Sequence, residues 1–400
     1  MLRDVVVVGG SLSGLRAAES LRSGGYDGAI TVIGDERHHP YDRPPLSKRL
    51  LSGEWEPDRI SLRKPDELAS LDVRWRTGSV AIGLDIVNRF VRLADGDEVP
   101  YGGAILATGA APRRLPGQEH VSNAVVLRTL EDSLELRKRI VSGGKRVIVI
   151  GAGFIGLEVA ATARGLGNQV LVVEAASAPL IRALGPEMGT AVASIHAEND
   201  VEIRCGVGVE GLTEQGVVLA GGVFEPADVI VVGIGVTPTT DWLAGSGLTV
   251  RDGVVCTSAL NVGVPLVYAA GDIVRWHNPL FDEEMRVEHW TNAAEQGGLA
   301  ASNLLAESTG QPVESYAPVP FFWSEQYDRR IQFLGRCGAD DEVRVVVGSA
   351  SGLRFAALYG RAGRLNGVLG VNMPKAVMSF RKLLQDRISW QDAIAHAATL

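Results

Sequence analysis

Two short segments of the 400-residue chain carry glycines at a spacing that suits the binding of a phosphate group. Residues 9–14 read Gly-Gly-Ser-Leu-Ser-Gly, and residues 151–156 read Gly-Ala-Gly-Phe-Ile-Gly. Each segment follows four β-branched residues, at 5–8 and at 147–150, and precedes a stretch that reads as a helix. Glycines at such a turn let a pyrophosphate approach the backbone at the helix N-terminus, where N–H groups and the helix dipole favour an anion. The two turns therefore predict two dinucleotide-binding sites.

The residues around both turns predict the same βαβ unit. In the first copy a helix runs to about Leu21, and a strand from Ala29 leads to Asp35 and Glu36. In the second copy a helix runs to about Leu166, and the strand at 170–174 ends in an acid. The strands show no polar alternation, which is typical of parallel strands covered on both faces. A single Gly-rich turn is a weak signal, but two copies, each followed by an acid at the expected distance, are a strong one.

The residues next to the turns predict which nucleotides bind. Ser11 stands where the second glycine of the first turn is usual, so the backbone there carries a Cβ, although its hydroxyl can donate a hydrogen bond. Asp35 or Glu36 is expected to hold the ribose of the first nucleotide. Glu174 is expected to bind a ribose 2′-hydroxyl and to repel a 2′-phosphate, which favours NADH over NADPH. Arg182 lies close enough downstream to contact the adenosine end of the same nucleotide.

Charge and hydropathy exclude some classes of protein. The net charge of −8 argues against a nucleic-acid binder. Residues 320–400 hold eleven basic and seven acidic residues, a local charge of +4 that leaves −12 for the rest. This basic end suits docking of an acidic partner, and a solvated surface with chance asymmetry explains it equally well. Apolar runs such as 229–236 are shorter than the roughly 18 residues of a membrane span, and a strand begins too early for a signal peptide. We therefore expect a cytoplasmic protein that does not bind membranes.

The three cysteines predict neither a metal site nor a disulfide framework. Cys205, Cys256 and Cys337 lie far apart and form no CxxC, no CxxxxC and no zinc-ligand spacing. A small, odd number of cysteines is typical of a reducing compartment. No metal site is predicted.

The order of the elements predicts three domains. The chain leaves the first nucleotide-binding unit, completes the second within 109–235, and returns at 268–272. Beyond residue 319, strands at 331–334, 343–347 and 355–359 and helices at 376–384 and 390–397 predict a smaller α+β domain. The predicted boundaries are 1–108 with 236–318 for the first domain, 109–235 for the second and 319–400 for the third.

Five motifs together resemble those of the glutathione-reductase-like flavoproteins. More narrowly, they resemble the ferredoxin and rubredoxin reductases of bacterial oxygenase systems, of the putidaredoxin reductase and biphenyl dioxygenase ferredoxin reductase type. The resemblance covers essentially the whole chain and implies two Rossmann-type domains, for FAD and then NAD, and a C-terminal α+β domain. The motifs are Tyr-Asp-Arg-Pro-Pro-Leu-Ser-Lys at 41–48, Leu-Ala-Thr-Gly at 106–109, Tyr-Ala-Ala-Gly-Asp at 268–272, Glu-His-Trp-Thr-Asn-Ala at 288–293 and Pro-Phe-Phe-Trp-Ser-Glu-Gln-Tyr at 320–327, of which the first and last are narrow markers.

The resemblance extends the predicted FAD site beyond the first glycine turn. It favours Arg43 and Arg128 as partners of the phosphates, and we expect Val80 to meet the adenine through its backbone. It also implies that Asp272 binds the ribityl chain; the residue could equally be a helix N-cap, and both roles can hold at once. The predicted FAD site comprises Gly9, Ser11, Leu12, Ser13, Gly14, Asp35, Glu36, Arg43, Lys48, Val80, Ala107, Thr108, Gly109, Arg128, Gly271, Asp272, Glu288, His289, Trp290 and Ala293.

The resemblance also implies a reaction centre beside the flavin N5 atom. It pairs Lys48 with Glu158, which lies two residues beyond the second glycine turn and is expected to face the nicotinamide. We expect both residues to position the reactants, since the hydride passes between the cofactors without a protein acid or base. Trp290 and Trp323 are implied near the flavin, Trp323 toward the electron acceptor, although core packing is the usual role of a tryptophan. The predicted NAD site comprises Gly151, Gly153, Phe154, Ile155, Gly156, Glu158, Glu174, Arg182, Gly233, Ile234 and Gly235.

The absence of sulfur at residues 44–47 indicates how electrons leave the protein. Disulfide reductases need a cysteine pair at the flavin, so here electrons are expected to pass directly, one at a time, to an outside acceptor. The leading interpretation is an NADH-dependent ferredoxin reductase whose iron–sulfur partner supplies a cytochrome monooxygenase or a Rieske-type dioxygenase. Rubredoxin reductase is a near variant, an NADH oxidase or quinone reductase is an alternative, and a non-catalytic flavoprotein of the apoptosis-inducing-factor kind is a third class. We expect a monomer or a weak homodimer.

Overall fold

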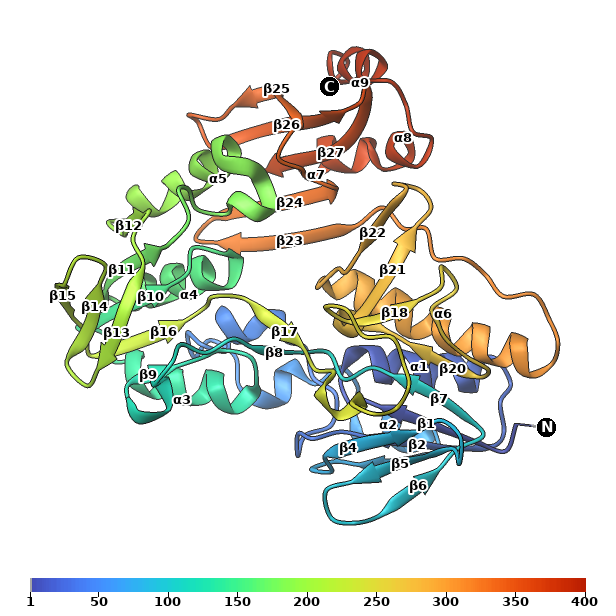
Figure 1. The fold of residues 1–400 in the computed structure, drawn as a ribbon. Coiled ribbons are helices and arrows are strands. Elements are labelled where there is room, and N and C mark those ends of the chain that lie inside the picture. The colour runs from blue at the N-terminus through green and yellow to red at the C-terminus, as the bar shows by residue number, and fades with distance from the viewer. Residues whose placement is uncertain (1) are drawn as a thin grey trace. The chain divides into compact units, whose positions relative to one another are not determined.

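The computed structural model describes residues 2–400, which form two compact units (Figure 1). The first unit contains the chain up to Asp42, Ser61–Ala111 and Thr237–Pro320. The second contains Arg43–Ile60, Pro112–Val236 and Phe321–Leu400. β8 (Ala110–Pro112) and β17 (Val236–Pro238) lie where the chain passes from one unit to the other. The predicted domain boundaries at 108, 235 and 318 remain a prediction.

The first unit is built on a six-stranded sheet of order β19-β20-β7-β1-β2-β3, parallel except for the pair β19 and β20. The central strands are apolar on both faces, so helices must cover the sheet. α1 (Leu12–Ser23) and α6 (Trp290–Ser308) pack closely, since a Cβ at Gly297 would lie 2.3 Å from the Ser13 carbonyl oxygen. The strands are β1 (Asp4–Val8), β2 (Ala29–Ile33), β3 (Val73–Arg76), β7 (Gly103–Leu106), β19 (Asn261–Val264) and β20 (Val267–Ala269).

Two small sheets and short helices complete the first unit. One sheet has the order β4-β5-β6 and the other β18-β21-β22. Their strands are β4 (Ala81–Asp85), β5 (Phe90–Leu93), β6 (Glu98–Pro100), β18 (Val254–Cys256), β21 (Val274–Asn278) and β22 (Glu283–Met285). The helices are α2 (Pro65–Ser70), η4 (Asp241–Leu243) and η5 (Gly271–Ile273).

The second unit contains a five-stranded parallel sheet of order β12-β11-β10-β16-β9. Its strands are β9 (Ala124–Val125), β10 (Arg146–Ile150), β11 (Gln169–Glu174), β12 (Glu202–Cys205) and β16 (Val229–Val232). A three-stranded sheet adds β13 (Val209–Thr213), β14 (Gly216–Leu219) and β15 (Val223–Pro226). The helices are α3 (Leu130–Ile140), α4 (Phe154–Gly165), α5 (Ile181–Ala197), η1 (Pro44–Ser47), η2 (Pro57–Ile60) and η3 (Gln118–His120).

The C-terminal part of the second unit is an antiparallel sheet of order β23-β24-β27-β26-β25 with three short helices (Figure 1). The predicted strands fall inside β24, β25 and β26, whereas β23 and β27 were not predicted. The helix predicted at 376–384 is two helices that meet at the fully buried Phe380. The elements are β23 (Phe321–Gln326), β24 (Arg329–Gly335), β25 (Glu342–Ser349), β26 (Arg354–Arg361), β27 (Arg364–Val371), α7 (Pro374–Ser379), α8 (Arg381–Gln385) and α9 (Trp390–Ala397).

The fold class predicted from the two glycine turns is confirmed: each turn joins a strand of a mainly parallel sheet to a helix, and an α+β region follows. No helix within residues 2–400 combines the length and the apolarity that crossing a membrane requires.

Candidate functional site

The first glycine turn joins β1 to α1 so tightly that side chains would not fit at two of its positions. Gly9 has a φ of +127°, and a Cβ there would lie 2.0 Å from the Ala107 carbonyl oxygen. A Cβ at Gly14 would lie 1.9 Å from the Gly9 carbonyl oxygen. Ser11 is the N-cap of α1, and its side chain makes no capping hydrogen bond. The first-turn N–H groups of α1 have no acceptor within the helix, which makes this end suited to an anion.

The start of α6 lies beside the start of α1. The Ser13 hydroxyl donates a hydrogen bond to the Ala293 carbonyl oxygen at 2.8 Å. Gly271 has a φ of +82°, and a Cβ there would lie 2.5 Å from the Ser13 hydroxyl oxygen. Its N–H donates to Oε1 of the buried Gln296 at 2.9 Å. The structure therefore brings three predicted residues of the FAD site together, with the hydroxyl hydrogen of Ser13 donated to Ala293.

Asp272 lies inside η5, whose N-cap is Ala270, so the alternative interpretation of Asp272 as an N-cap is wrong. The Asp272 carbonyl oxygen accepts a hydrogen bond from Arg286 at 3.2 Å. The same guanidinium group donates to Glu288 at 2.6 Å. Arg286 thus links two predicted FAD-site residues that are 16 positions apart in the sequence.

Trp290 begins α6, directly after the N-cap His289. Its indole Nε1 donates to Oδ1 of Asp42 at 2.7 Å, and the residue is half-buried. This polar contact sets Trp290 apart from a tryptophan that only fills a core.

The segment 107–109 follows β7 at the carboxyl end of the first unit's sheet, against the first glycine turn. The Thr108 hydroxyl donates to the Thr239 carbonyl oxygen at 2.8 Å and accepts from Nε1 of Trp242 at 3.3 Å. The Gly109 carbonyl oxygen accepts from the Thr239 N–H at 2.9 Å. Ligands of open parallel sheets bind at this edge, so the segment lies where the FAD prediction needs it.

The acids after β2 lie close to the predicted adenine contact. Glu36 accepts a hydrogen bond from the Tyr41 hydroxyl, and its carbonyl oxygen accepts one from the Gly78 N–H at 2.8 Å. The turn that precedes Val80 is therefore held against the end of β2. Asp35 is exposed, and its carboxylate accepts the Glu36 N–H at 3.0 Å.

Two predicted phosphate partners lie in the second unit and are in contact with each other. The Arg43 guanidinium donates to the Arg128 carbonyl oxygen at 2.6 Å. The backbone N–H of Arg128 donates to the carboxylate of Asp132, near the start of α3, at 3.0 Å.

The second glycine turn repeats the geometry of the first between β10 and α4. A Cβ at Gly151, whose φ is +106°, would lie 2.3 Å from the Gly233 carbonyl oxygen. A Cβ at Gly156 would lie 2.2 Å from the Gly151 carbonyl oxygen. Gly153, the N-cap of α4, is not crowded as these two glycines are, because a Cβ there would meet no atom within 4 Å. Open space at the helix N-terminus is where a pyrophosphate would bind.

Glu174 ends β11 with its carboxylate fixed beside this turn. One oxygen accepts the Ala152 N–H at 2.7 Å, and the other accepts the Ala176 N–H at 2.8 Å. The Leu180 N–H donates to the Ala152 carbonyl oxygen at 3.0 Å, which holds the start of α5 near the turn. Arg182, in the first turn of α5, is exposed.

The remaining predicted NAD residues line the same edge of the sheet. The Phe154 ring contacts Phe322 edge-on, with centroids 4.8 Å apart, while Ile155 is 46% exposed. Residues 233–235 follow β16, and the carbonyl oxygen of Gly235 accepts the Arg113 N–H at 2.9 Å.

Lys48 and Glu158 form the predicted pair. The Lys48 Nζ lies 2.7 Å from Oε2 of Glu158, and the side chains are 16% and 7% exposed. The Ser47 hydroxyl donates to the same oxygen at 2.5 Å, and the Ser324 hydroxyl donates to Oε1 at 2.6 Å. Removing such an ion pair from water is costly, so stability alone does not explain it.

The two serines that hold Glu158 were missed by the sequence analysis. Both lie inside the narrow motifs, Ser47 next to Lys48 and Ser324 next to Trp323. No spacing rule links residues so far apart, so only their place in those motifs could have signalled them.

The loop that carries Lys48 is anchored at several points. The buried Ser133 hydroxyl of α3 donates to the Leu46 carbonyl oxygen at 2.7 Å. The Thr162 hydroxyl of α4 donates to the Ser47 carbonyl oxygen at 2.7 Å. These bonds tie the loop to the helix that bears Glu158, so the ion pair is preorganised.

Trp323 is adjacent to Ser324 on β23, and neighbouring side chains of a strand point to opposite faces. Trp323 therefore faces away from Glu158. Its half-buried ring stacks against Phe321, with centroids 6.0 Å apart.

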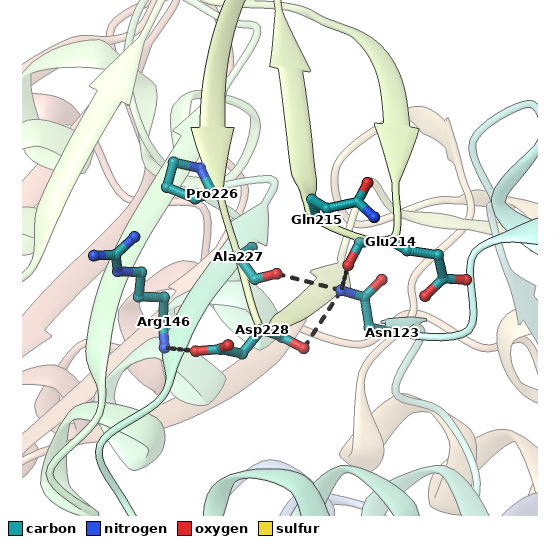
Figure 2. Close-up of a pocket in the computed structure, with 7 residues that line it drawn as sticks. All are labelled: Asn123, Arg146, Glu214, Gln215, Pro226, Ala227 and Asp228. Carbon is teal, nitrogen blue, oxygen red and sulfur yellow. Dashed lines mark hydrogen bonds between the residues drawn. The ribbon is translucent and has the colours of Figure 1, made fainter.

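Figure 2 shows a pocket of about 450 Å³ at the other end of the five-stranded parallel sheet. Arg146 begins β10 and Asp228 precedes β16, so this pocket lies at the amino ends of strands whose carboxyl ends carry the glycine turn. It is therefore not the nucleotide site. Its lining residues are Asn123, Arg146, Glu214, Gln215, Pro226, Ala227 and Asp228.

The two glycine turns define a class of protein with two dinucleotide sites. Residues 3–297 match the family described as pyridine nucleotide-disulphide oxidoreductase, and residues 321–399 match the reductase C-terminal family. The chain belongs to the pyridine nucleotide-disulphide oxidoreductase family and, within it, to the ferredoxin reductases. It is an FAD-containing oxidoreductase that uses NAD(P)H.

Several relatives match almost the whole chain. Putidaredoxin reductase CamA of Pseudomonas putida is 33% identical over 396 residues, which cover 96% of this chain and 92% of that protein. Rhodocoxin reductase of Rhodococcus erythropolis is 36% identical over 388 residues, with 95% and 89% covered. The crystal structure of a covalent putidaredoxin reductase–putidaredoxin complex matches with a TM-score of 0.91 at 33% identity, covering 97% of this chain and 94% of that one.

The residues fit the cofactors that the family implies. In both units a Cβ at two glycines of the turn would collide with the backbone. Each turn is followed by a helix whose first N–H groups can bind an anion. The carboxylate of Glu174 is fixed beside the second turn. In the first unit Gly34 has the matching position after the strand, and Glu36 follows two residues later.

Replacing Gly153 by Ala should raise the Kd for NADH by about tenfold, because the added methyl group occupies the space left for the pyrophosphate. The thermal midpoint should stay unchanged, since a Cβ there meets no protein atom and the φ of −79° suits alanine. Titration of flavin fluorescence with a nicotinamide nucleotide measures the first quantity and calorimetry the second. Gly165→Ala, at another open position of α4, is the control. Unchanged nucleotide affinity would contradict the assignment.

Replacing Glu174 by Ala should reduce the preference for NADH over NADPH, because the repulsion of a 2′-phosphate is removed. The ratio of kcat/KM for the two nucleotides measures the preference, with an expected drop of about tenfold or more. Glu202→Ala, at the exposed start of β12, serves as the control. An unaltered ratio would contradict the assignment of Glu174 to the nucleotide site.

Proposed function

We propose that this protein is an NADH-dependent ferredoxin reductase that supplies single electrons to an iron–sulfur ferredoxin. FAD held at the first glycine turn would supply two-electron chemistry toward NADH and one-electron chemistry toward the acceptor. The observation that carries the proposal is the Lys48–Glu158 pair, buried next to the second glycine turn and held by two serine hydroxyls.

The protein's own contribution to the reaction is binding and orientation. We propose that Glu174 holds the adenosine ribose and selects NADH, while Arg182 contacts the adenosine end. Glu158 keeps the Lys48 ammonium in one place, and the anchored loop prevents both groups from turning toward solvent. Such preorganisation holds the nicotinamide ring in a reactive orientation without any proton transfer by the pair.

The cysteines support direct electron transfer to a partner. Cys205 and Cys256 belong to strands of different units, and Cys337 follows β24. Burial raises the pKa of the Cys256 thiol and raises that of Cys337 to about 11, with Asp341 adding to the latter. Thiols with raised pKa values are poor nucleophiles, so a thiol relay is not favoured.

The acceptor that we propose is an acidic ferredoxin. Two of the relatives are named as reductases of putidaredoxin and of rhodocoxin. The local charge of +4 over residues 320–400 would attract an acidic protein, and Trp323 would lie on the acceptor side. A cytoplasmic monomer or weak homodimer that serves an oxygenase through this ferredoxin completes the proposal.

Anaerobic stopped-flow mixing tests the function. The purified holoenzyme is mixed with NADH, the flavin absorbance is followed, and the reduced enzyme is then mixed with a panel of ferredoxins and with rubredoxin. Fast bleaching followed by fast reduction of one ferredoxin is the expected result. Fast bleaching with reoxidation only by oxygen or a quinone would overturn the proposal in favour of an oxidase or quinone reductase, and transfer to rubredoxin alone would make it a rubredoxin reductase.

Replacing Lys48 by Ala should slow flavin bleaching by NADH by about tenfold to a hundredfold, because the positioning group is lost. FAD retention, measured as the flavin-to-protein absorbance ratio, should fall much less. Lys138→Ala, on the exposed face of α3, controls for the loss of a positive charge. Normal bleaching in the Lys48 variant would count against a role in the reaction.

A further inference from the structure

Beyond Ser324, the hydrogen bonds that start at Glu158 continue through the second unit. The Gln326 amide nitrogen donates to the Ser324 hydroxyl oxygen at 3.2 Å. The Gln326 amide oxygen lies 2.9 Å from Nε2 of His196, and the Tyr327 hydroxyl lies 3.2 Å from Nδ1 of the same ring. We call Glu158, Ser324, Gln326, His196 and Tyr327 the polar row. It links α4, β23 and α5, which Figure 1 labels.

The inner members of the polar row are almost sealed from water. Ser324 and Gln326 are each 1% exposed, and His196 is 0% exposed. A buried polar group without a partner is destabilising, so each bond in the row constrains the next. The proposed reaction assigns no role to His196 or Gln326.

The charge on Glu158 dictates the direction of every hydrogen bond in the row. A carboxylate oxygen can only accept, so the Ser324 hydroxyl must donate to it. The Ser324 oxygen therefore accepts from the Gln326 amide nitrogen, which turns the amide oxygen toward His196. That oxygen requires a proton on Nε2 of His196, and Nδ1 is left to accept from the Tyr327 hydroxyl.

We propose that Ser324, Gln326 and His196 are positioning residues for Glu158, and that the Glu158 charge sets the tautomer of His196 through this row. The role in positioning rests on the proposed function, whereas the tautomer depends only on the hydrogen bonds. Burial also lowers the pKa of His196, despite the hydrogen bond to Gln326, which favours the neutral ring. Burial raises the pKa of Tyr327, against the opposing effect of Arg164, so its hydroxyl stays a donor.

Replacing Glu158 by Gln supplies a test, because it exchanges one acceptor for a donor without changing the shape. The Lys48 ammonium and the Ser47 hydroxyl both donate to Oε2 of Glu158. In the Gln variant the amide oxygen must therefore take the place of Oε2. The new amide nitrogen then faces Ser324, which can no longer donate in that direction.

The rest of the row must then reverse. The Ser324 hydroxyl turns to donate to Gln326, whose amide rotates to present its oxygen. The Gln326 nitrogen now donates to Nε2 of His196, which must lose its proton. The neutral ring carries its proton on Nδ1 instead and donates to the Tyr327 oxygen, which can also accept.

The experiment is ¹⁵N NMR of the holoenzyme labelled at its histidine ring nitrogens, because protonated and unprotonated ring nitrogens resonate far apart. His196→Asn identifies the signals by their loss. The wild type should show a neutral His196 with the proton on Nε2, and Glu158→Gln should move it to Nδ1. His396, whose Nε2 contacts Ser379 at 3.2 Å outside the row, should keep its signals in both proteins. A His196 proton on Nδ1 in the wild type, or an unchanged tautomer in Glu158→Gln, would overturn the proposal.

A kinetic measurement tests positioning. Ser324→Ala should slow flavin bleaching by NADH by about tenfold, with a smaller change in the Kd for NADH, since Oε1 of Glu158 loses its donor. Ser324→Thr keeps the hydroxyl and should restore the rate, and Ser379→Ala, a serine beside a histidine outside the row, should match the wild type. Equal slowing in the Ala and Thr variants, or none in the Ala variant, would refute positioning. Failure to reduce any ferredoxin would refute the proposed function while leaving the His196 tautomer test intact.

Discussion

A carboxylate that is withdrawn from water keeps its charge only where protein donors replace the hydrogen bonds of the solvent. Glu158 meets this requirement with one ammonium group and two hydroxyl groups, contributed by segments near residues 48 and 324. The anchoring of the Lys48 loop to α3 and α4, and the packing of β23 against α4 through Phe154 and Phe322, follow from this constraint.

The glycine turns impose the second constraint, which is steric. In each unit a Cβ on the last glycine of the turn would collide with the carbonyl oxygen of the first. A Cβ on the first glycine would collide with the carbonyl oxygen of the residue that follows the neighbouring strand, Ala107 or Gly233. These contacts leave no room for a side chain and fix the height of the helix above the strand end. Where the first turn has Ser11 the second has Gly153, and a Cβ at Gly153 would meet no atom within 4 Å. The protein itself therefore leaves room for a Cβ at this position of the second turn, and the first turn carries one there in Ser11.

The local sequence pattern was enough to predict the elements that are uniformly buried. The strands beside both turns, the helices after them and the acids that follow were predictable because apolar runs and glycine spacing report on backbone geometry directly. β23 was not predicted as a strand, since its aromatic run reads as a motif rather than as alternation, and β27 carries glycines that weaken the signal. The break at Phe380 was missed because a helical pattern continues across it. Ser47, Ser324 and His196 could not be found from spacing, since their partners lie more than 100 positions away in the sequence.

The place of Ser324 and Trp323 on one strand has a consequence for building chimeras. The two side chains point to opposite faces of β23, so one strand serves both the Glu158 carboxylate and the surface that carries Phe321. Exchanging the C-terminal region between relatives in order to change the acceptor would therefore also exchange a donor to the buried carboxylate. A junction placed after β23 rather than before it would keep the original Ser324. The reaction with the nicotinamide nucleotide would then not depend on which C-terminal region is introduced.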